Sequence, residues 1–452
     1  MRHTLVKSAC LCLLFSGIAI NGWAQATAED VARLGKDLTP FGAEQAASAD
    51  GAIPAWDGGI TTAPAGYSAG DRHADPYASD KILQTITAAN MDKYADKLTE
   101  GNKAMLKAYP SFKMNVYPTH RSAAAPQRIY DATKRIAADS KVVDGGQGME
   151  NYGEGIPFPL PKQGIEVVWN HLSRWRGDSV VRTFIDAPVT RSGDYQPIVM
   201  REELDFKYSH SGANDDNTSH VWNFKQSVLS PARIAGIVLL AKEPLNSVTE
   251  KRSAWSYNPG QRRVRRAPNL AFDTPRTGSD GLSSNDQTDM FSGSPEQYDW
   301  KLVGKKELYV PYNAYKLHSD EITYKDILTP LHMNPDYLRY ELHRVWIVEA
   351  TLKEGIRNIY KRRTLYVDED SWMIIGADCY DNRDQLWRVS ESHSINYYEV
   401  PTFMPTSEVH HDLQSGRYIS SYLSNESKPF EFNVKFKNKN FTPSSLRRSG
   451  RR

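Results

Sequence analysis

The sequence predicts a mostly β protein built on one large antiparallel sheet. Aromatic residues make up 11% of the chain, with 24 Tyr and 10 Trp, and such side chains favour strands. From about residue 178 onward, strand-like segments follow one another with turn signals between them and few helical crossovers. Strands connected without crossover helices run antiparallel to their neighbours. A chain of 452 residues is long enough to form its own hydrophobic core.

The first 24 residues have the pattern of a cleaved signal peptide. Arg2 and Lys7 precede an apolar run that ends at Ile20 and is too short to span a bilayer. Ala24 and Ala26 follow as small residues at which a signal peptidase can cut. An uncleaved membrane anchor is the alternative, but the apolar run ends too early for it. We therefore expect an exported protein.

Charge and cysteine content exclude several function classes. Removing Arg2 and Lys7 from the 56 basic residues leaves 54 against 54 acidic residues, a balance with no general attraction to nucleic acid. Loss of Cys10 and Cys12 with the signal peptide leaves Cys379 alone. A single cysteine can form neither an internal disulfide nor a cysteine-based zinc site. We expect no cofactor and no metal.

Residues 25–154 are expected to form an irregular, wrapping N-terminal arm with helices. The stretch 27–75 is rich in Ala, Gly, Asp and Pro. A short helix is predicted at Ala28–Leu34 and a longer one over 79–108, where apolar residues recur at helical spacing.

Residues 155–440 are expected to form the main, curved β domain. It opens with a proline-rich entry and a helix in which Ile165, Val168, Trp169, Leu172 and Trp175 recur at spacings of three and four. This helix either packs its two tryptophans into the core or acts as a lid over an apolar groove.

The strands of this domain are predicted from alternation and from the turns between them. Asn334-Pro335 should start a short helix, and the tail 441–452 is expected to be disordered and basic. The predicted strands are Ser179–Ile185, Met200–Tyr208, His220–Val228, Arg233–Leu240, Lys251–Tyr257, Arg262–Ala267, Trp300–Val310, Val345–Leu352, Ile359–Val367, Trp372–Cys379, Gln385–Glu391, Arg417–Leu423 and Phe430–Lys435.

The segment 252–267 predicts a β-hairpin with aromatic residues on one arm and arginines on the other. Trp255 and Tyr257 alternate with small residues before an Asn-Pro-Gly turn. On the second arm, alternation places Arg263 and Arg265 on one face and Arg262 and Arg266 on the other. Aromatic surfaces beside guanidinium groups suit a ligand with an apolar body and an anionic head. The alternative is a solvated sheet face.

These patterns give six candidate ligand-binding residues and no catalytic or metal-binding residue. The candidates are Trp169, Trp175, Trp255, Tyr257, Arg263 and Arg265.

Motifs of known catalytic chemistry are not found in the sequence. There is no GxSxG, HExxH or Walker motif. His343, near Glu341 and Glu349, suits either a general base or a buried ion network, of which the network is favoured. Asp280, Asp286 and Asp289 do not have the spacing of a calcium loop, and we expect loop or helix-cap roles for them.

Four long segments resemble domain-of-unknown-function family 1329, which is described as outer-membrane lipoprotein-sorting-like. They are LGKDLTPFGAEQAASADGAIPAWDGG, GIPFPLPKQGIEVVWNHLSRWRG, SAWSYNPGQRRVRRAPNLAFDTP and YLRYELHRVWIVEATLKEGIRNIYKRRTLYVDEDSW. Two hairpins, at 255–259 and 366–389, are also similar to those of the LolA/LolB carriers. The resemblance covers nearly the whole mature chain. It implies a curved antiparallel half-barrel with lid helices and an apolar groove.

The resemblance also implies a location and a function. Members are exported by Gram-negative bacteria and are associated with RND-type (MMPL-like) inner-membrane transporters and an outer-membrane β-barrel protein. We therefore expect a periplasmic carrier of a hydrophobic or lipid-like molecule, either free or peripheral to one of the two membranes. The alternative is a periplasmic adaptor that carries nothing, and an enzyme acting on lipid or polysaccharide is a third, less favoured hypothesis.

The signal peptide provides the first testable prediction. The mature protein should start near Gln25 or Thr27, because the small residues that follow the apolar run allow cleavage there. Intact-mass measurement of periplasmic material checks this. Retention of residues 1–24, or sedimentation with membranes after a carbonate wash, would contradict it.

Overall fold

The computed structural model describes residues 26–210, 220–267 and 272–450. The predicted signal peptide therefore lies outside the described residues. Within them, no helix is both long and apolar enough to cross a bilayer.

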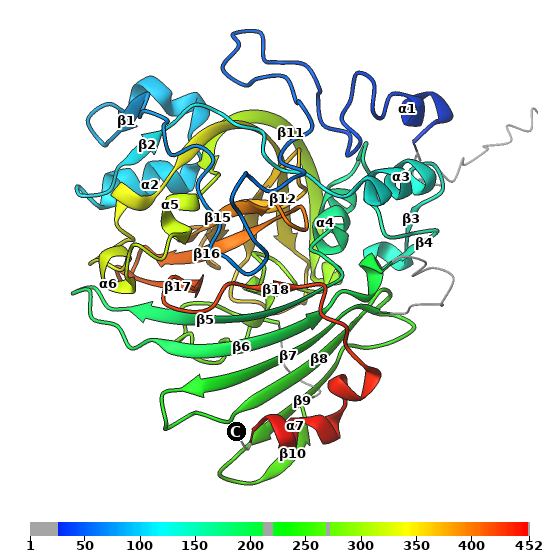
Figure 1. Ribbon diagram of the computed structural model, residues 1–452, viewed down its shortest axis with the longest axis vertical. Coiled ribbons are helices and arrows are strands. Elements are labelled where there is room, and N and C mark those ends of the chain that lie inside the picture. The colour runs from blue at the N-terminus through cyan, green and yellow to red at the C-terminus, as the bar shows by residue number, and fades with distance from the viewer. Residues whose placement is uncertain (1–25, 211–219, 268–271, 451–452) are drawn as a thin grey trace, which may run out of the picture.

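The core of the fold is a 16-stranded sheet in the order β1-β2-β12-β13-β14-β15-β16-β17-β5-β6-β7-β8-β9-β10, with β11 added on β12 and β18 on β5 (Figure 1). Every pair in it is antiparallel except β2 with β12. The strands are β1 Gln84–Ile86, β2 Met114–Val116, β5 Ser179–Val189, β6 Ile198–Asp205, β7 His220–Ser230, β8 Val238–Pro244, β9 Ser253–Asn258, β10 Arg263–Arg266, β11 Tyr298–Pro311, β12 Tyr340–Leu352, β13 Arg362–Asp368, β14 Ile374–Tyr380, β15 Leu386–Tyr397, β16 Thr402–Asp412, β17 Arg417–Leu423 and β18 Glu431–Phe432.

Short helices and one small hairpin surround this sheet. The hairpin consists of β3 Lys141–Val143 and β4 Gly148–Glu150. The α-helices are α1 Ala28–Ala32, α2 Glu100–Ala108, α3 Gln127–Ile136, α4 Gly164–Ser173, α5 Tyr315–His318, α6 Tyr324–Ile327 and α7 Pro443–Ser449. The 3-10 helices are η1 Met91–Lys97, η2 Asp144–Gly146, η3 Lys207–Ser209, η4 Asn285–Gln287, η5 Pro295–Gln297, η6 Pro335–Tyr337 and η7 Asn438–Phe441.

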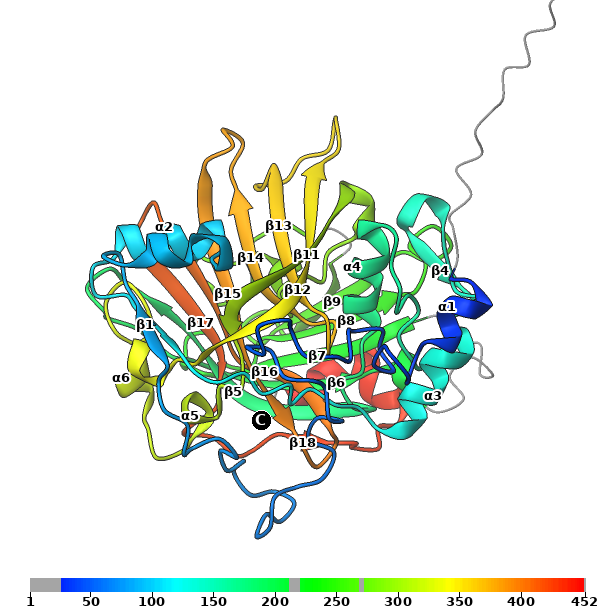
Figure 2. The same ribbon diagram turned by 90° about the horizontal axis from the view of Figure 1, so that it is seen from above.

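The sheet curves strongly, so that strands β13–β15 run in a very different direction from β6–β8 (Figure 2). We call its two sides the inner face, which carries α4 and the crossing segment 272–297, and the outer face, which carries α2 and α7. Arg363 and Leu365 of β13 are directed to the inner face, where they meet Asp286 and the core around α4. Tyr366 is directed outward and donates a hydrogen bond to Asp378, whose other partner is the start of α2. The expected mostly β, curved antiparallel architecture is thereby confirmed.

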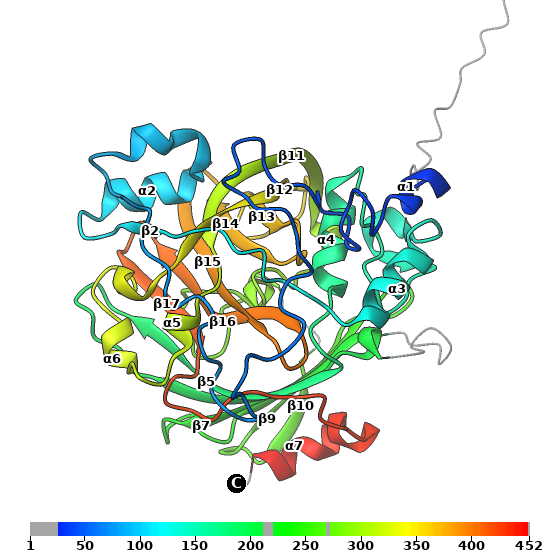
Figure 3. The ribbon, with the colours of Figure 1, turned by 45° about the horizontal axis from the view of Figure 1, so that its top comes forward.

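The N-terminal arm runs along the outside of the sheet, as its blue trace in Figure 3 shows. Between its short helices and strands, the arm is held by buried apolar side chains such as Phe41 and Ile53 and by single hydrogen bonds and ion pairs. The Trp372 indole donates to the carbonyl of Phe41 at 3.0 Å, and Arg121 binds both carboxylate oxygens of Asp370. Irregular backbone can only be packed in this way when its polar groups find partners.

Two predicted elements differ from the structure, and one strand was not predicted. The helix expected over 79–108 is divided into β1, η1 and α2, because Thr85 and Ile86 pair with β2 and a capping box at Thr99 starts a new helix. The helix after Asn334 was predicted to continue through Leu342. In the structure it ends at Tyr337, and β12 starts at Tyr340. Strand β16 was not predicted, because Pro405 and the polar residues of this segment interrupt the alternation of apolar and polar residues that indicates a strand. Pro405 lies at a bulge, which tolerates proline.

The C-terminal tail also differs from the expectation of disorder. Residues 443–449 form α7, which starts with Pro443 at its first position. Leu446 and Phe441 are fully buried against Tyr257 and the outer face of β8. Two apolar residues in an otherwise polar, basic segment are therefore enough to attach it to the sheet.

Replacement of Leu446 by Ala tests whether α7 is part of the folded core. Leu446→Ala should lower the free energy of unfolding by about 2–4 kcal/mol, as for other buried leucines. Chemical denaturation measures this, with Ser444→Ala on the exposed side of α7 as the control. Equal stability of the two variants would mean that the tail is not packed.

Candidate functional site

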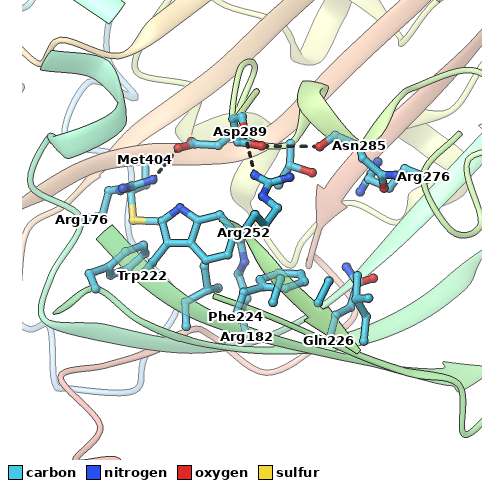
Figure 4. A pocket seen from close by; sticks show the side chains of 17 residues that line it. Arg176, Arg182, Trp222, Phe224, Gln226, Arg252, Arg276, Asn285, Asp289 and Met404 are labelled. Carbon is cyan, nitrogen blue, oxygen red and sulfur yellow. Dashed lines mark hydrogen bonds and ion pairs between the residues drawn. The ribbon is translucent and has the colours of Figure 1, made fainter. Parts of the chain in front are cut away.

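A pocket lies between the inner face of β6–β9 and the crossing segment (Figure 4). Its volume is about 90 Å³. The floor is apolar and comes from four neighbouring strands, and Met404 of β16 reaches it from across the sheet. The floor consists of Leu204, Phe206, Trp222, Phe224, Leu239, Ala241 and Ala254.

Strand alternation explains why this floor is apolar. Along β7, Trp222, Phe224 and Gln226 are directed to the pocket, whereas Asn223 and Lys225 between them are directed outward. Phe224 lies opposite Leu204 on one side and Ala241 on the other. The floor therefore continues from strand to strand. Its members Leu204, Trp222 and Leu239 are only partly buried.

Four arginines surround the floor, and each has an acidic partner. Arg182 donates to Glu202 at 2.7 Å, and Arg276 lies 2.9 Å from Asp186. The other two are Arg176, paired with Asp289, and Arg252, paired with Glu243. Buried charges need such partners, because desolvation of an unpaired ion costs several kcal/mol.

Asp289 holds the crossing segment in place over the pocket. Arg174 donates to both of its carboxylate oxygens, and Arg176 adds a contact of 2.7 Å. Burial would raise the pKa of Asp289, but the two guanidinium groups lower it, so that the carboxylate stays ionised. Asp289 was expected in a loop or cap role. It lies in a turn, and it is also the centre of a buried ion cluster just beyond the end of α4.

His171 of α4 makes a second connection to the same segment. Its Nδ1 accepts a hydrogen bond from the backbone N–H of Ile374 at 3.1 Å, so Nε2 carries the proton and donates to the carbonyl of Asp289 at 2.9 Å. Complete burial, helped by the charge of Arg174, lowers the pKa of His171 to about 3. The imidazole is therefore a neutral structural group.

Arg252 separates the pocket from a second hollow of about 210 Å³. Its guanidinium lies 4.5 Å from the ring centroid of Phe272 and 5.7 Å from that of Trp222. It donates to the carbonyl of Ser292 at 2.8 Å and pairs with Glu243, which also lines the second hollow. Movement of this one side chain would join the two spaces.

None of the six sequence-predicted ligand residues lines this pocket. Trp169 and Trp175 belong to the core between α4 and the sheet, and their indoles donate to the carbonyls of Gly146 and Pro401. The helix that carries Trp169 lies on the inner face, as expected. A small hollow of about 20 Å³ remains between Trp169 and Leu172 of this helix and Val221 and Trp222 of β7.

The structure separates the hairpin residues that were expected to act together. Trp255 and Tyr257 are directed to the outer face and pack under α7. Arg265 lies opposite Ser256 in the register, which places Arg265 and Arg263 on the inner face, both exposed. Their role in ligand binding stays a prediction.

Sequence reasoning missed the pocket residues, although one signal was present. The alternation of Trp222 and Phe224 with polar residues in HVWNFKQ is that of a strand with one apolar face. The strand was predicted, but its sequence does not say that this face is left partly open. Arg252 is the first residue of the predicted hairpin segment 252–267, but it was not singled out as a ligand residue.

A separate cluster of titratable groups is formed by β12, the end of β13 and the turn that follows β13. Ligand atoms of His343, Asp368 and Asp370 all lie within 4.8 Å of one another, which is close enough for a metal ion. Arg121 already neutralises Asp370 through two hydrogen bonds. His343 lies 3.1 Å from Glu341. The arrangement agrees with the buried ion network favoured for His343.

Glu408 of β16 provides a pH test of the charged inner face. It is buried beside Arg182, Arg276 and Asp289, and burial raises its pKa to about 8 from an ordinary value of 4.5. The folded state therefore keeps a proton that the unfolded state releases above pH 4.5. As pH rises toward 8, the free energy of unfolding of the wild type should therefore fall. The fall should be larger than that of Glu408→Gln by on the order of 2–4 kcal/mol.

Denaturation curves from pH 5 to 9 measure this difference. Glu431→Gln, at an exposed position on β18, is the matched control. Parallel profiles for wild type and Glu408→Gln would show that Glu408 is ionised when buried.

Comparison with known proteins places the chain in a family. An uncharacterized protein of Pseudomonas aeruginosa is 47% identical along the full length of both chains. A DUF1329 family protein from Desulfovibrio piger has a solved structure that is similar at 16% identity, covering 60% of this chain and 92% of that one, with a TM-score of 0.42. A LolA superfamily protein from Nitrosomonas europaea covers 62% and 98% at 13% identity, with a TM-score of 0.39. The family model described as protein of unknown function (DUF1329) matches residues 85–447, and the chain belongs to this family.

Proposed function

We propose that the protein is a periplasmic carrier that binds a hydrophobic or lipid-like molecule on the floor of the inner-face pocket. The observation that supports this most is the partly exposed apolar surface of Leu204, Trp222 and Leu239 inside the curved sheet. Apolar surface that a cargo would cover contributes about 25 cal/mol per Å² to binding. The arginines at the edge of the floor suit a cargo with a polar or anionic end.

A lipid-sized cargo requires the pocket to enlarge. At about 90 Å³, the space is well below the roughly 300–1,000 Å³ of pockets that enclose drug-sized ligands. Rotation of Arg252 out of its position between Trp222 and Phe272 would join the second hollow of about 210 Å³. The carrier would therefore open by breaking the contacts of Arg252 with Glu243 and Ser292. The cargo would then contact the rings of Trp222 and Phe272 in place of the Arg252 guanidinium.

The charge state of the lining favours binding over chemistry. Among the described lining residues, Asp289 is the single carboxylate, and two arginines keep its pKa low. A general acid or base needs a pKa near the working pH. A carrier needs no proton transfer, so the proposal assigns no catalytic residue.

In this proposal the cargo passes between an RND-type (MMPL-like) inner-membrane transporter and an outer-membrane β-barrel protein, the partners that the family resemblance implies. A hydrophobic molecule that crosses the aqueous periplasm needs its apolar surface covered. An adaptor would connect the same partners without binding cargo, and the following experiment separates the two functions.

Trp222→Ala should weaken binding of a fluorescent fatty-acid probe by about tenfold, because the indole supplies a large part of the open floor. Fluorescence titration measures this in solution without membranes. Trp175→Ala is the matched control: its buried indole should contribute to stability, so that the variant unfolds more easily but binds the probe with little change. Absence of probe binding by the wild-type protein would favour the adaptor.

A further inference from the structure

Positive charge is concentrated in two segments of an otherwise balanced chain. The formal net charge of the whole sequence is +2. The hairpin segment 251–267 contains no acidic residue, and neither does the C-terminal segment 432–450. Such a separation of charge is not needed for folding and points to an interaction surface.

The tertiary structure brings these two segments together at one end of the molecule. Helix α7 packs on β8, β9 and β10 (Figure 1). Tyr257 of the hairpin is buried against Leu446 and Phe441 of the C-terminal segment. Gly450 lies so close to the Tyr257 ring that a Cβ there would be 2.4 Å from it. The contact is therefore part of the fold.

Apart from Arg252, which pairs with Glu243, and Lys251, nine basic residues of these two segments are exposed, and none of the nine makes an ion pair with another described residue. This contrasts with the inner face, where each pocket arginine has an acidic partner. We call these nine residues the basic edge: Arg262, Arg263, Arg265, Arg266, Lys435, Lys437, Lys439, Arg447 and Arg448.

We propose that the basic edge docks the protein on an anionic lipid surface. Each basic residue near such a surface strengthens association, and nine at one end give the molecule a defined orientation. The end of β7 adds an apolar contact, since Leu229 is 47% exposed and Gly236 of the loop that follows β7 lies next to Pro259 of the hairpin.

The position of the edge favours a membrane over another polyanion. Arg263 and Arg265 lie on the same face of the sheet as the pocket floor. Arg265 pairs with Ser256, whose neighbour on β8 is Leu239 of the floor. Docking through the edge would place the pocket within two strands of the lipid surface. A cargo that leaves or enters a bilayer needs this short path, so this part rests on the proposed function, whereas the docking itself does not.

The basic edge could instead serve only to protect an exposed edge strand. Charged side chains on an edge strand prevent pairing with other chains, and β10 ends the sheet order. That role requires no affinity for lipid. The two explanations therefore differ in a direct binding measurement.

Vesicle co-sedimentation of the purified protein tests the proposal without any cargo. Vesicles of phosphatidylcholine with one third phosphatidylglycerol should bind the protein at low salt, and pure phosphatidylcholine should not. Binding should fall as salt screens the charges. The variant R262Q/R263Q/R265Q/R266Q should bind at least about tenfold more weakly, because each arginine near the surface contributes roughly fivefold.

A matched control variant removes the same number of positive charges from another part of the molecule. Lys81, Lys93, Lys107 and Lys134 are exposed and lie near β1, α2 and α3, at the other end of the molecule. K81Q/K93Q/K107Q/K134Q should change vesicle binding by less than about twofold. Circular dichroism should stay unchanged in both variants, and the vesicle assay contains no fatty-acid probe, which keeps this test separate from that of the carrier.

Three results would overturn the proposal. Absence of binding to the anionic vesicles at low salt would leave edge protection or an acidic protein partner as the role of these residues. Equal weakening by the two variants would mean that total charge, not the basic edge, causes binding. Equal affinity for both kinds of vesicle would mean that apolar insertion dominates.

Discussion

The inner face of the sheet depends on complete pairing of buried charges. The crossing segment contributes Asp286 and Asp289, and the sheet and the end of α4 supply Arg363, Arg174 and Arg176 to meet them. Removing one member of such a pair costs about 3–5 kcal/mol, because the other charge stays buried without a partner. These pairs therefore determine where the segment crosses the sheet and how much of the inner face it covers.

The pocket lies where the crossing segment does not fully cover the inner face of the sheet. Its polar residues meet the charged part of the inner face, whereas Trp222, Leu204 and Leu239 lie beyond them and keep part of their surface open. Because strand alternation separates two faces, the same strands β8 and β9 contribute to the pocket on one side and bury Tyr257 under α7 on the other. The proposed binding surface and the core under α7 therefore lie on opposite faces of the same strands.

The two kinds of arginine in this protein have different physical roles. Those around the pocket are paired and take part in holding the fold together, as Arg182 does with Glu202. Those of the basic edge have no acidic partner among the described residues and remain available to a partner outside the chain. A pocket for an apolar molecule beside a basic edge is an arrangement that can combine capture of cargo with attachment to a surface.

The sequence alone determined the class of the fold, because strand alternation and turn residues are local properties. It also determined the helix at 164–173 and the start of α1. It did not determine β16, where Pro405 and polar residues are buried only because neighbouring strands cover them, or the attachment of the tail through Leu446. The candidate site was not predictable for the same reason. Trp255 and Trp222 have similar local patterns and are both partly buried, and only the packing of α7 on one face and of the crossing segment on the other decides that Trp255 lies beside α7 and that Trp222 lines the pocket.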